Sequence, residues 1–99
     1  MEKTSLLTKI DEIIDSRSAE IAEMSDFFAA NPEVSGTEFK TSAKIADVLA
    51  KSGFDVTYPY MNISTAFMAS KKKKKEGAKA AILVEYDALP EIGHACGHN

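Results

Sequence analysis

The residues that could carry chemistry gather at the C-terminal end of this 99-residue sequence. Both histidines and the single cysteine fall in the segment His94-x-Cys96-x-His98, where glycine and alanine separate them. Residues two apart in an extended segment point to the same side. Thiolate and imidazole groups are good ligands for Zn²⁺ and similar ions. Cys96 and His98 are therefore candidate ligands of one metal ion or of two neighbouring ions.

Two acids, Glu85 and Asp87, precede this segment directly after an apolar run. If the run is a strand, both acids lie at its carboxyl end, which is where α/β sheets bind ligands. Asp87 could be a metal ligand, or it could fix the tautomer of a ligating histidine. The alternative is a buried cysteine with partly exposed histidines on a structural loop. The clustering with the acids favours the metal site.

Two helices are predicted ahead of this region. Residues 4–30 carry apolar side chains at three- and four-residue steps, which predicts one long amphipathic helix that ends at Asn31-Pro32. A second helix is expected to begin near Ser35, because Ser35 and Glu38 have the spacing of a capping box. Gly53 stands where a helix commonly ends in a left-handed residue.

Three strands are predicted to follow the helices, over residues 54–58, 62–69 and 79–86. The last of these is continuously apolar, which is typical of a strand buried on both faces. The lysine run 71–75 favours a solvated turn between strands, with binding to an anionic surface as the alternative. The predicted fold class is α/β, with two helices followed by about three strands in an incomplete sheet.

The composition sets limits on function. The sequence is 44% hydrophobic and 27% charged with a formal net charge of −3, which indicates one small globular domain. The mild acidity gives no case for nucleic acid as a partner. No apolar run approaches the roughly 20 residues of a membrane helix. The N-terminus has no apolar signal core, and a single cysteine suits a reducing compartment, so a cytoplasmic protein without a membrane partner is expected.

The C-terminal segment resembles the signature of a known enzyme family. Residues 85–99 read EYDALPEIGHACGHN, and this pattern is similar to that of the binuclear-metal amidohydrolase and peptidase family of aminoacylase and carboxypeptidase G. The segments 31–35, 38–42 and 53–56 also resemble that family. The Glu-Tyr-Asp opening and the final Asn99 look most like its branch of aminobenzoyl-glutamate hydrolases and dipeptidases, to which indole-acetyl-amino-acid hydrolases are related.

The resemblance implies roles for individual residues. Cys96 and His98 match the positions that ligate metal in this branch, and Asp87 matches the aspartate that supports the metal site in catalysis. Neither Glu85 nor His94 receives a role from it. It further implies two divalent ions (Zn²⁺, Mn²⁺ or Co²⁺), a small amide or dipeptide substrate, and a homodimer for the full-length enzyme.

The resemblance also implies that residues 1–99 are the N-terminal segment of a zinc-peptidase-like catalytic domain. The rest of that domain, including the glutamate base, and the lid and dimerisation domain would lie beyond Asn99. We then expect the isolated segment to be inactive, and to be marginally stable or to associate through exposed apolar surface. The alternative is a truncated, non-catalytic module for metal binding or interaction.

Overall fold

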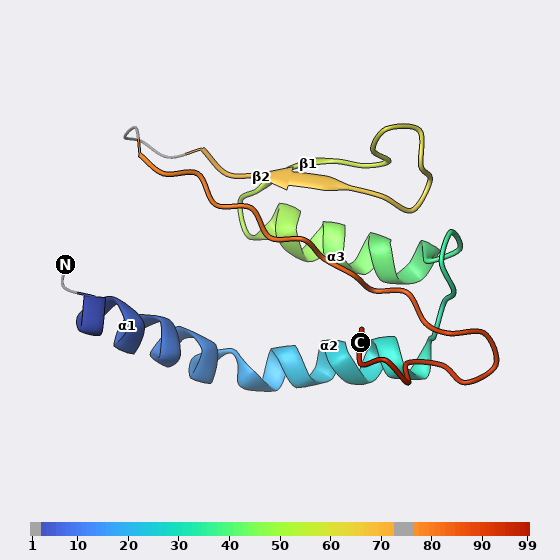
Figure 1. Cartoon of the computed structure of the whole chain (residues 1–99). Helices are drawn as coiled ribbons and strands as arrows, with labels where there is room; N and C mark the ends of the chain where they lie inside the picture. Colours follow the sequence, from blue (N-terminus) through green and yellow to red (C-terminus); the bar gives the residue numbers. More distant parts are fainter. Residues whose placement is uncertain (1–2, 73–76) are drawn as a thin grey trace.

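The computed structural model describes residues 3–72 and 77–99, in which helices precede a small antiparallel sheet (Figure 1). The elements in chain order are α1 (Lys3–Ser16), α2 (Ser18–Ala30), α3 (Phe39–Lys51), β1 (Asp55–Thr57) and β2 (Met68–Ser70). The chain is a small α/β unit with a partial sheet, as the sequence predicts. Within the described residues it has one more helix and fewer paired strands than expected.

The prediction of one helix over residues 4–30 is wrong, because the helix breaks at Arg17. The N–H of Arg17 donates to the carbonyls of both Ile13 and Ile14, at 3.2 and 3.1 Å. The Ser16 hydroxyl also donates to the Ile13 carbonyl, at 2.7 Å. A side chain that bonds back onto the helix competes with the regular ladder. The backbone of Arg17 therefore leaves helical geometry (φ −107°, ψ 8°), and α2 starts with the next residue.

The apolar stripe of α1 faces solvent. None of the α1 residues is buried, and Leu7 and Ile14 are each 52% exposed. In Figure 1 α1 projects away from α3 and the sheet, and among the described elements its substantial packing is on α2. The sequence pattern thus predicts the amphipathic helix, but the described residues supply nothing that covers its apolar face.

Helix α3 begins four residues later than predicted. The capping box of Ser35 and Glu38 does not form, since Glu38 is the cap residue and its side chain makes no cap hydrogen bond. The carboxylate of Glu33 instead accepts hydrogen bonds from the backbone N–H groups of Lys40 (3.0 Å) and Thr41 (2.7 Å). These are two of the N–H groups that a helix start leaves without partners. The predicted end is confirmed, with Gly53 in the left-handed region (φ 92°).

The sheet consists of β1 and β2 packed against α3. The strands pair antiparallel, with Val56 opposite Ala69. The predicted first strand is therefore confirmed in its central residues, whereas only the end of the predicted strand 62–69 is paired. The core is small and partly polar: Phe28, Ala46 and Ala88 are its buried apolar residues, and Thr41 and Ser42 are wholly enclosed.

The predicted buried strand over residues 79–86 is wrong for the described chain. This segment is extended but pairs with no other described strand, and Ile82 and Leu83 are 87% and 94% exposed. Burial on two faces needs neighbouring strands and covering helices, which the described residues do not provide. Most of the lysine run, residues 73–75, lies outside the described residues. Among those described, every helix falls short of the length and apolar character that a bilayer-crossing helix needs.

Candidate functional site

The candidate site begins where the C-terminal segment docks onto the connection between α2 and α3. The backbone N–H of Ala88 donates to the carbonyl of Glu33 at 2.7 Å, and Ala88 forms a parallel bridge with Val34. Leu89 and Gly93 then exchange two hydrogen bonds of 2.9 and 3.2 Å, which close a tight loop. Ala88 is 4% exposed, so this docking point is part of the core.

The segment after the loop returns to α2. The side-chain amide of Asn99 donates to the Ser25 hydroxyl at 3.0 Å and to its carbonyl at 3.4 Å, and Figure 1 shows the C-terminus beside α2. Gly93 and Gly97 have φ values of 68° and 78°. Glycine adopts this left-handed conformation without steric penalty, so the two glycines permit the turns around Cys96.

Asp87 and His98 form the central contact of the site. Nδ1 of His98 lies 3.0 Å from Oδ1 of Asp87 and 3.2 Å from the Asp87 backbone carbonyl oxygen. Both neighbours are acceptors, so Nδ1 carries the hydrogen and donates it. The ring is about one third exposed, and its Nε2 atom is left as the free electron-pair donor. This is the arrangement in which an aspartate orients a ligating histidine.

The other chemistry-bearing residues are placed less closely. Glu85 reaches the far side of the ring, with Oε2 at 3.4 Å from Nε2 of His98. Cys96 is exposed and has a free thiol. Both ring nitrogens of His94 are buried and make no hydrogen bond with the described part of the chain. His94 therefore takes no part in the Asp87–His98 contact.

These residues match part of a metal site. Imidazole, thiolate and carboxylate groups suit Zn²⁺ and similar ions, and the orientation of His98 by Asp87 fits a ligating role. However, no group of three or more His, Cys, Asp and Glu side chains in the described chain is arranged to hold an ion. The donor set therefore fits an incomplete site.

A polar cluster beside the site was not predicted from the sequence. Tyr86 donates its hydroxyl hydrogen to the carbonyl of Thr65, and the Thr65 hydroxyl donates to the buried carboxylate of Glu38 at 3.3 Å. Burial raises the pKa of Tyr86, and the nearby Glu38 and Tyr58 raise it further. The Tyr86 ring also stacks on Phe67, with centroids 6.0 Å apart. These contacts fix the backbone directly before Asp87.

Glu33 is the other unpredicted residue. Partial burial raises the pKa of its carboxyl, but the hydrogen bonds from Lys40 and Thr41 and the Lys40 charge outweigh this effect. The pKa of Glu33 therefore lies below its ordinary value. Capping rules consider residues adjacent to a helix start, so a carboxylate several positions upstream gives no sequence signal.

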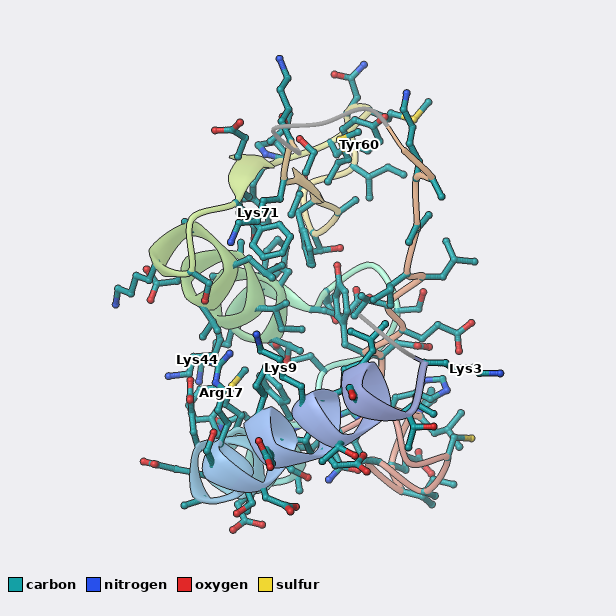
Figure 2. All side chains as sticks on the ribbon, turned by 90° about the vertical axis from the view of Figure 1, so that its left-hand side faces the viewer. Lys3, Lys9, Arg17, Lys44, Tyr60 and Lys71 are labelled. Carbon is teal, nitrogen blue, oxygen red and sulfur yellow. The ribbon has the colours of Figure 1, made fainter. Side chains whose placement is uncertain are left out.

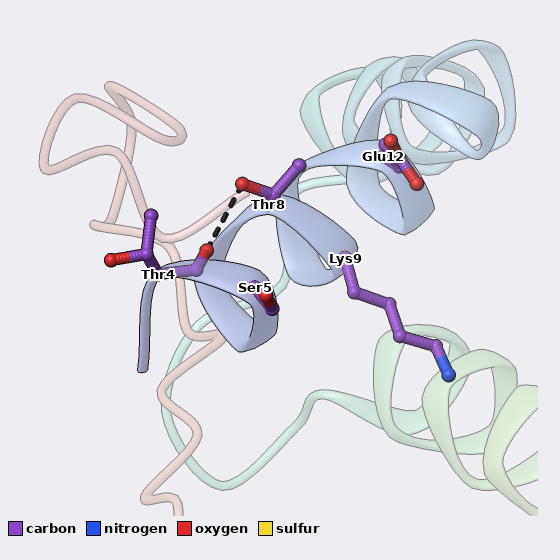
Figure 3. Close-up of a pocket in the computed structure, with 5 residues that line it drawn as sticks. All are labelled: Thr4, Ser5, Thr8, Lys9 and Glu12. Atoms are coloured by element: carbon purple, nitrogen blue, oxygen red, sulfur yellow. Dashed lines mark hydrogen bonds between the residues drawn. The ribbon is translucent and has the colours of Figure 1, made fainter. Parts of the chain in front are cut away.

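The surface hollows of the molecule lie away from these residues. One is a shallow depression lined by Thr4, Ser5, Thr8, Lys9 and Glu12, all from α1, where the Thr8 hydroxyl donates to the Thr4 carbonyl (Figure 3). A second lies between α2 and α3, where Lys44 approaches α2 with its Nζ atom 5.8 Å from the centre of the Phe27 ring (Figure 2). Neither hollow includes a residue of the candidate site.

Comparison with known proteins finds hydrolases and peptidases. The chain is 33% identical to one of the polypeptides of the p-aminobenzoyl-glutamate hydrolase of Escherichia coli over 91% of its length, and 29% identical to the Xaa-Arg dipeptidase of Mus musculus over 89%. It is 31% identical to thermostable carboxypeptidase 2 of Saccharolobus solfataricus over 70%. The chain spans about a fifth of the length of these relatives (22%, 22% and 21%). No family model matches the chain.

Proposed function

The chain is a relative of the amidohydrolase and peptidase family, and from this relationship we propose that it contributes part of the catalytic domain of a metal-dependent hydrolase. The proposed reaction is the cleavage of an amide or peptide bond in a small N-acyl-amino acid or dipeptide. The supporting relatives are named for p-aminobenzoyl-glutamate, for Xaa-Arg dipeptides and for carboxypeptidase activity. Since the chain spans about a fifth of each relative, the activity is proposed for a longer polypeptide in which these residues stand, as a homodimer in the cytoplasm.

One observation carries the proposal: the Asp87 carboxylate lies 3.0 Å from Nδ1 of His98. By accepting the Nδ1 hydrogen, Asp87 leaves the Nε2 lone pair of His98 available and restricts rotation of the ring. Cys96 adds a free thiol two residues earlier in the same segment. His98 and Cys96 would hold the metal in this proposal, and Asp87 would orient His98.

A divalent ion bound there would polarise the substrate carbonyl and lower the pKa of a water molecule. Two protein ligands are fewer than the three that a catalytic zinc site commonly has. The remaining ligands and the general base must therefore come from other residues. Consequently, we expect residues 1–99 alone to bind metal weakly and to hydrolyse nothing.

The first test is the mass of the native polypeptide in its source cell, followed by hydrolysis assays with p-aminobenzoyl-glutamate and with dipeptides. We expect a product several-fold larger than 99 residues whose Cys96→Ser and His98→Ala variants lose metal and activity together. Variants that keep full metal content and full activity would contradict the proposal. A native product that ends at Asn99 would favour a non-catalytic metal-binding or interaction module instead.

A further inference from the structure

Glu85 lies on the opposite side of the His98 ring from Asp87. Its Oε2 atom is 3.4 Å from Nε2, whereas Asp87 contacts Nδ1 at 3.0 Å. The imidazole thus stands between two carboxylates, one at each ring nitrogen. The metal site proposed above uses only one of these carboxylates, so the contact of Glu85 needs its own explanation.

The hydrogen bonds of His98 determine which nitrogen is the donor. Nδ1 faces two acceptors, Oδ1 and the backbone oxygen of Asp87, so it must carry a hydrogen. In a neutral imidazole Nε2 then presents a lone pair. That lone pair faces the Glu85 carboxylate oxygen, which is also an acceptor. Two acceptors at this distance repel unless a positive charge lies between them.

The distance between these two atoms suits a shared ion. Zinc binds histidine nitrogen and carboxylate oxygen at about 2.0–2.2 Å, and two such ligands at a tetrahedral angle lie about 3.4 Å apart. We propose that Glu85 and His98 are two ligands of one divalent cation, bound through Oε2 and Nε2. This inference deepens the proposed function and rests on it, because it assigns a ligand to the same metal site.

Exposure is consistent with an open site. The Glu85 side chain is 76% exposed and that of His98 is 30% exposed, so both atoms are accessible to an ion from solvent. Cys96 is exposed in the same segment and is the candidate for a third ligand. With water at the remaining position, this set would satisfy the tetrahedral coordination of zinc.

The test uses the 99-residue chain and Zn²⁺ alone, with affinity measured by competition against a chromophoric chelator. Glu85→Gln keeps the shape of the side chain and removes its charge. Glu91→Gln is the matched control, because Glu91 is exposed in the same segment. We expect Glu85→Gln to weaken zinc binding on the order of tenfold or more, and Glu91→Gln to leave it unchanged.

A spectroscopic measurement separates a shared ion from a simple ion pair. Nitrogen chemical shifts of ¹⁵N-labelled His98 report the state of each ring atom. We expect added Zn²⁺ to shift Nε2 while Nδ1 keeps its hydrogen, and we expect this shift to weaken in Glu85→Gln. Equal zinc affinity and equal shifts in Glu85→Gln and the unmodified chain would overturn the inference.

Two further variants distinguish this inference from the proposed function. If Cys96→Ser and His98→Ala weaken zinc binding but Glu85→Gln does not, the metal site stands and only the role of Glu85 fails. If neither Cys96→Ser nor His98→Ala weakens zinc binding, the proposed metal site fails and the role of Glu85 fails with it. A chain that binds no zinc at millimolar concentration overturns both.

Discussion

The backbone carbonyl of Glu33 accepts a hydrogen bond from the N–H of Ala88 at 2.7 Å, and the side chain of Glu33 caps helix α3. One residue therefore joins the start of α3 to the position directly after Asp87. Displacement of the Glu33 side chain would disturb the helix start and the docking point together. Glu33 thus connects the packing of the small core to the geometry of the candidate site.

Replacement of Glu33 by glutamine should destabilise the fold by about 1 kcal/mol, because a charged helix cap becomes a neutral one. Denaturant unfolding followed by circular dichroism measures this difference. Glu23→Gln is the matched control, since Glu23 is exposed on α2. Equal unfolding free energies for Glu33→Gln and Glu23→Gln would show that the cap contributes nothing.

The same carboxylate predicts a loss of stability in acid. The pKa of Glu33 is lowered from its ordinary value of 4.5, so the unfolded chain binds the proton more tightly than the folded one. The stabilisation is therefore present above pH 4.5 and is lost as the pH falls through the lowered pKa. The stability difference between the unmodified chain and Glu33→Gln, measured from neutral pH into strong acid, should shrink over this range. A constant difference would argue against an ionised cap.

The Tyr86→Phe variant keeps the ring stacked on Phe67 but removes the hydrogen bond to the Thr65 carbonyl. We expect a loss of about 1 kcal/mol in the free energy of unfolding. Because the pKa of Tyr86 is raised from 10.0, its contribution is present below pH 10 and is lost as the pH rises through the higher folded value. Absorbance titration of the phenolate band should lose its latest-titrating tyrosine in Tyr86→Phe. The control Tyr60→Phe should retain it.

The exposed segment around Leu83 predicts association of the isolated chain. Ile82 and Leu83 are almost fully exposed, and apolar surface of this kind favours contact between copies. Leu83→Lys should lower the apparent mass in sedimentation at high concentration, whereas Ser5→Lys, which adds the same charge on α1, should not. A sharp, reversible two-state melt of the unmodified chain as a monomer would contradict this prediction.

Local patterns in the sequence predict some elements well and others poorly. Gly53 marks the end of α3 because a left-handed residue is a local requirement, and strand β1 follows from local alternation. The Arg17 break depends on one serine hydroxyl, so apolar periodicity does not reveal it. The segment 79–86 has the composition of a buried strand, but burial depends on neighbours that the described chain does not supply. For the candidate site, residue spacing indicates the Asp87–His98 region but carries no information on Glu33 or on the position of the Glu85 carboxylate.

The hydrogen bond between Asn99 and Ser25 has a consequence for the order of folding. It joins residues 74 positions apart, whereas the Ser42–Tyr58 hydrogen bond that links α3 to the end of β1 spans 16. Closing the longer loop costs roughly 1.4 kcal/mol more in chain entropy. The α3–β1–β2 unit should therefore form first, and the C-terminal segment should dock last. By the same reasoning, that segment opens most readily in the native state, so backbone amides beside His98 should exchange with solvent before those of α3.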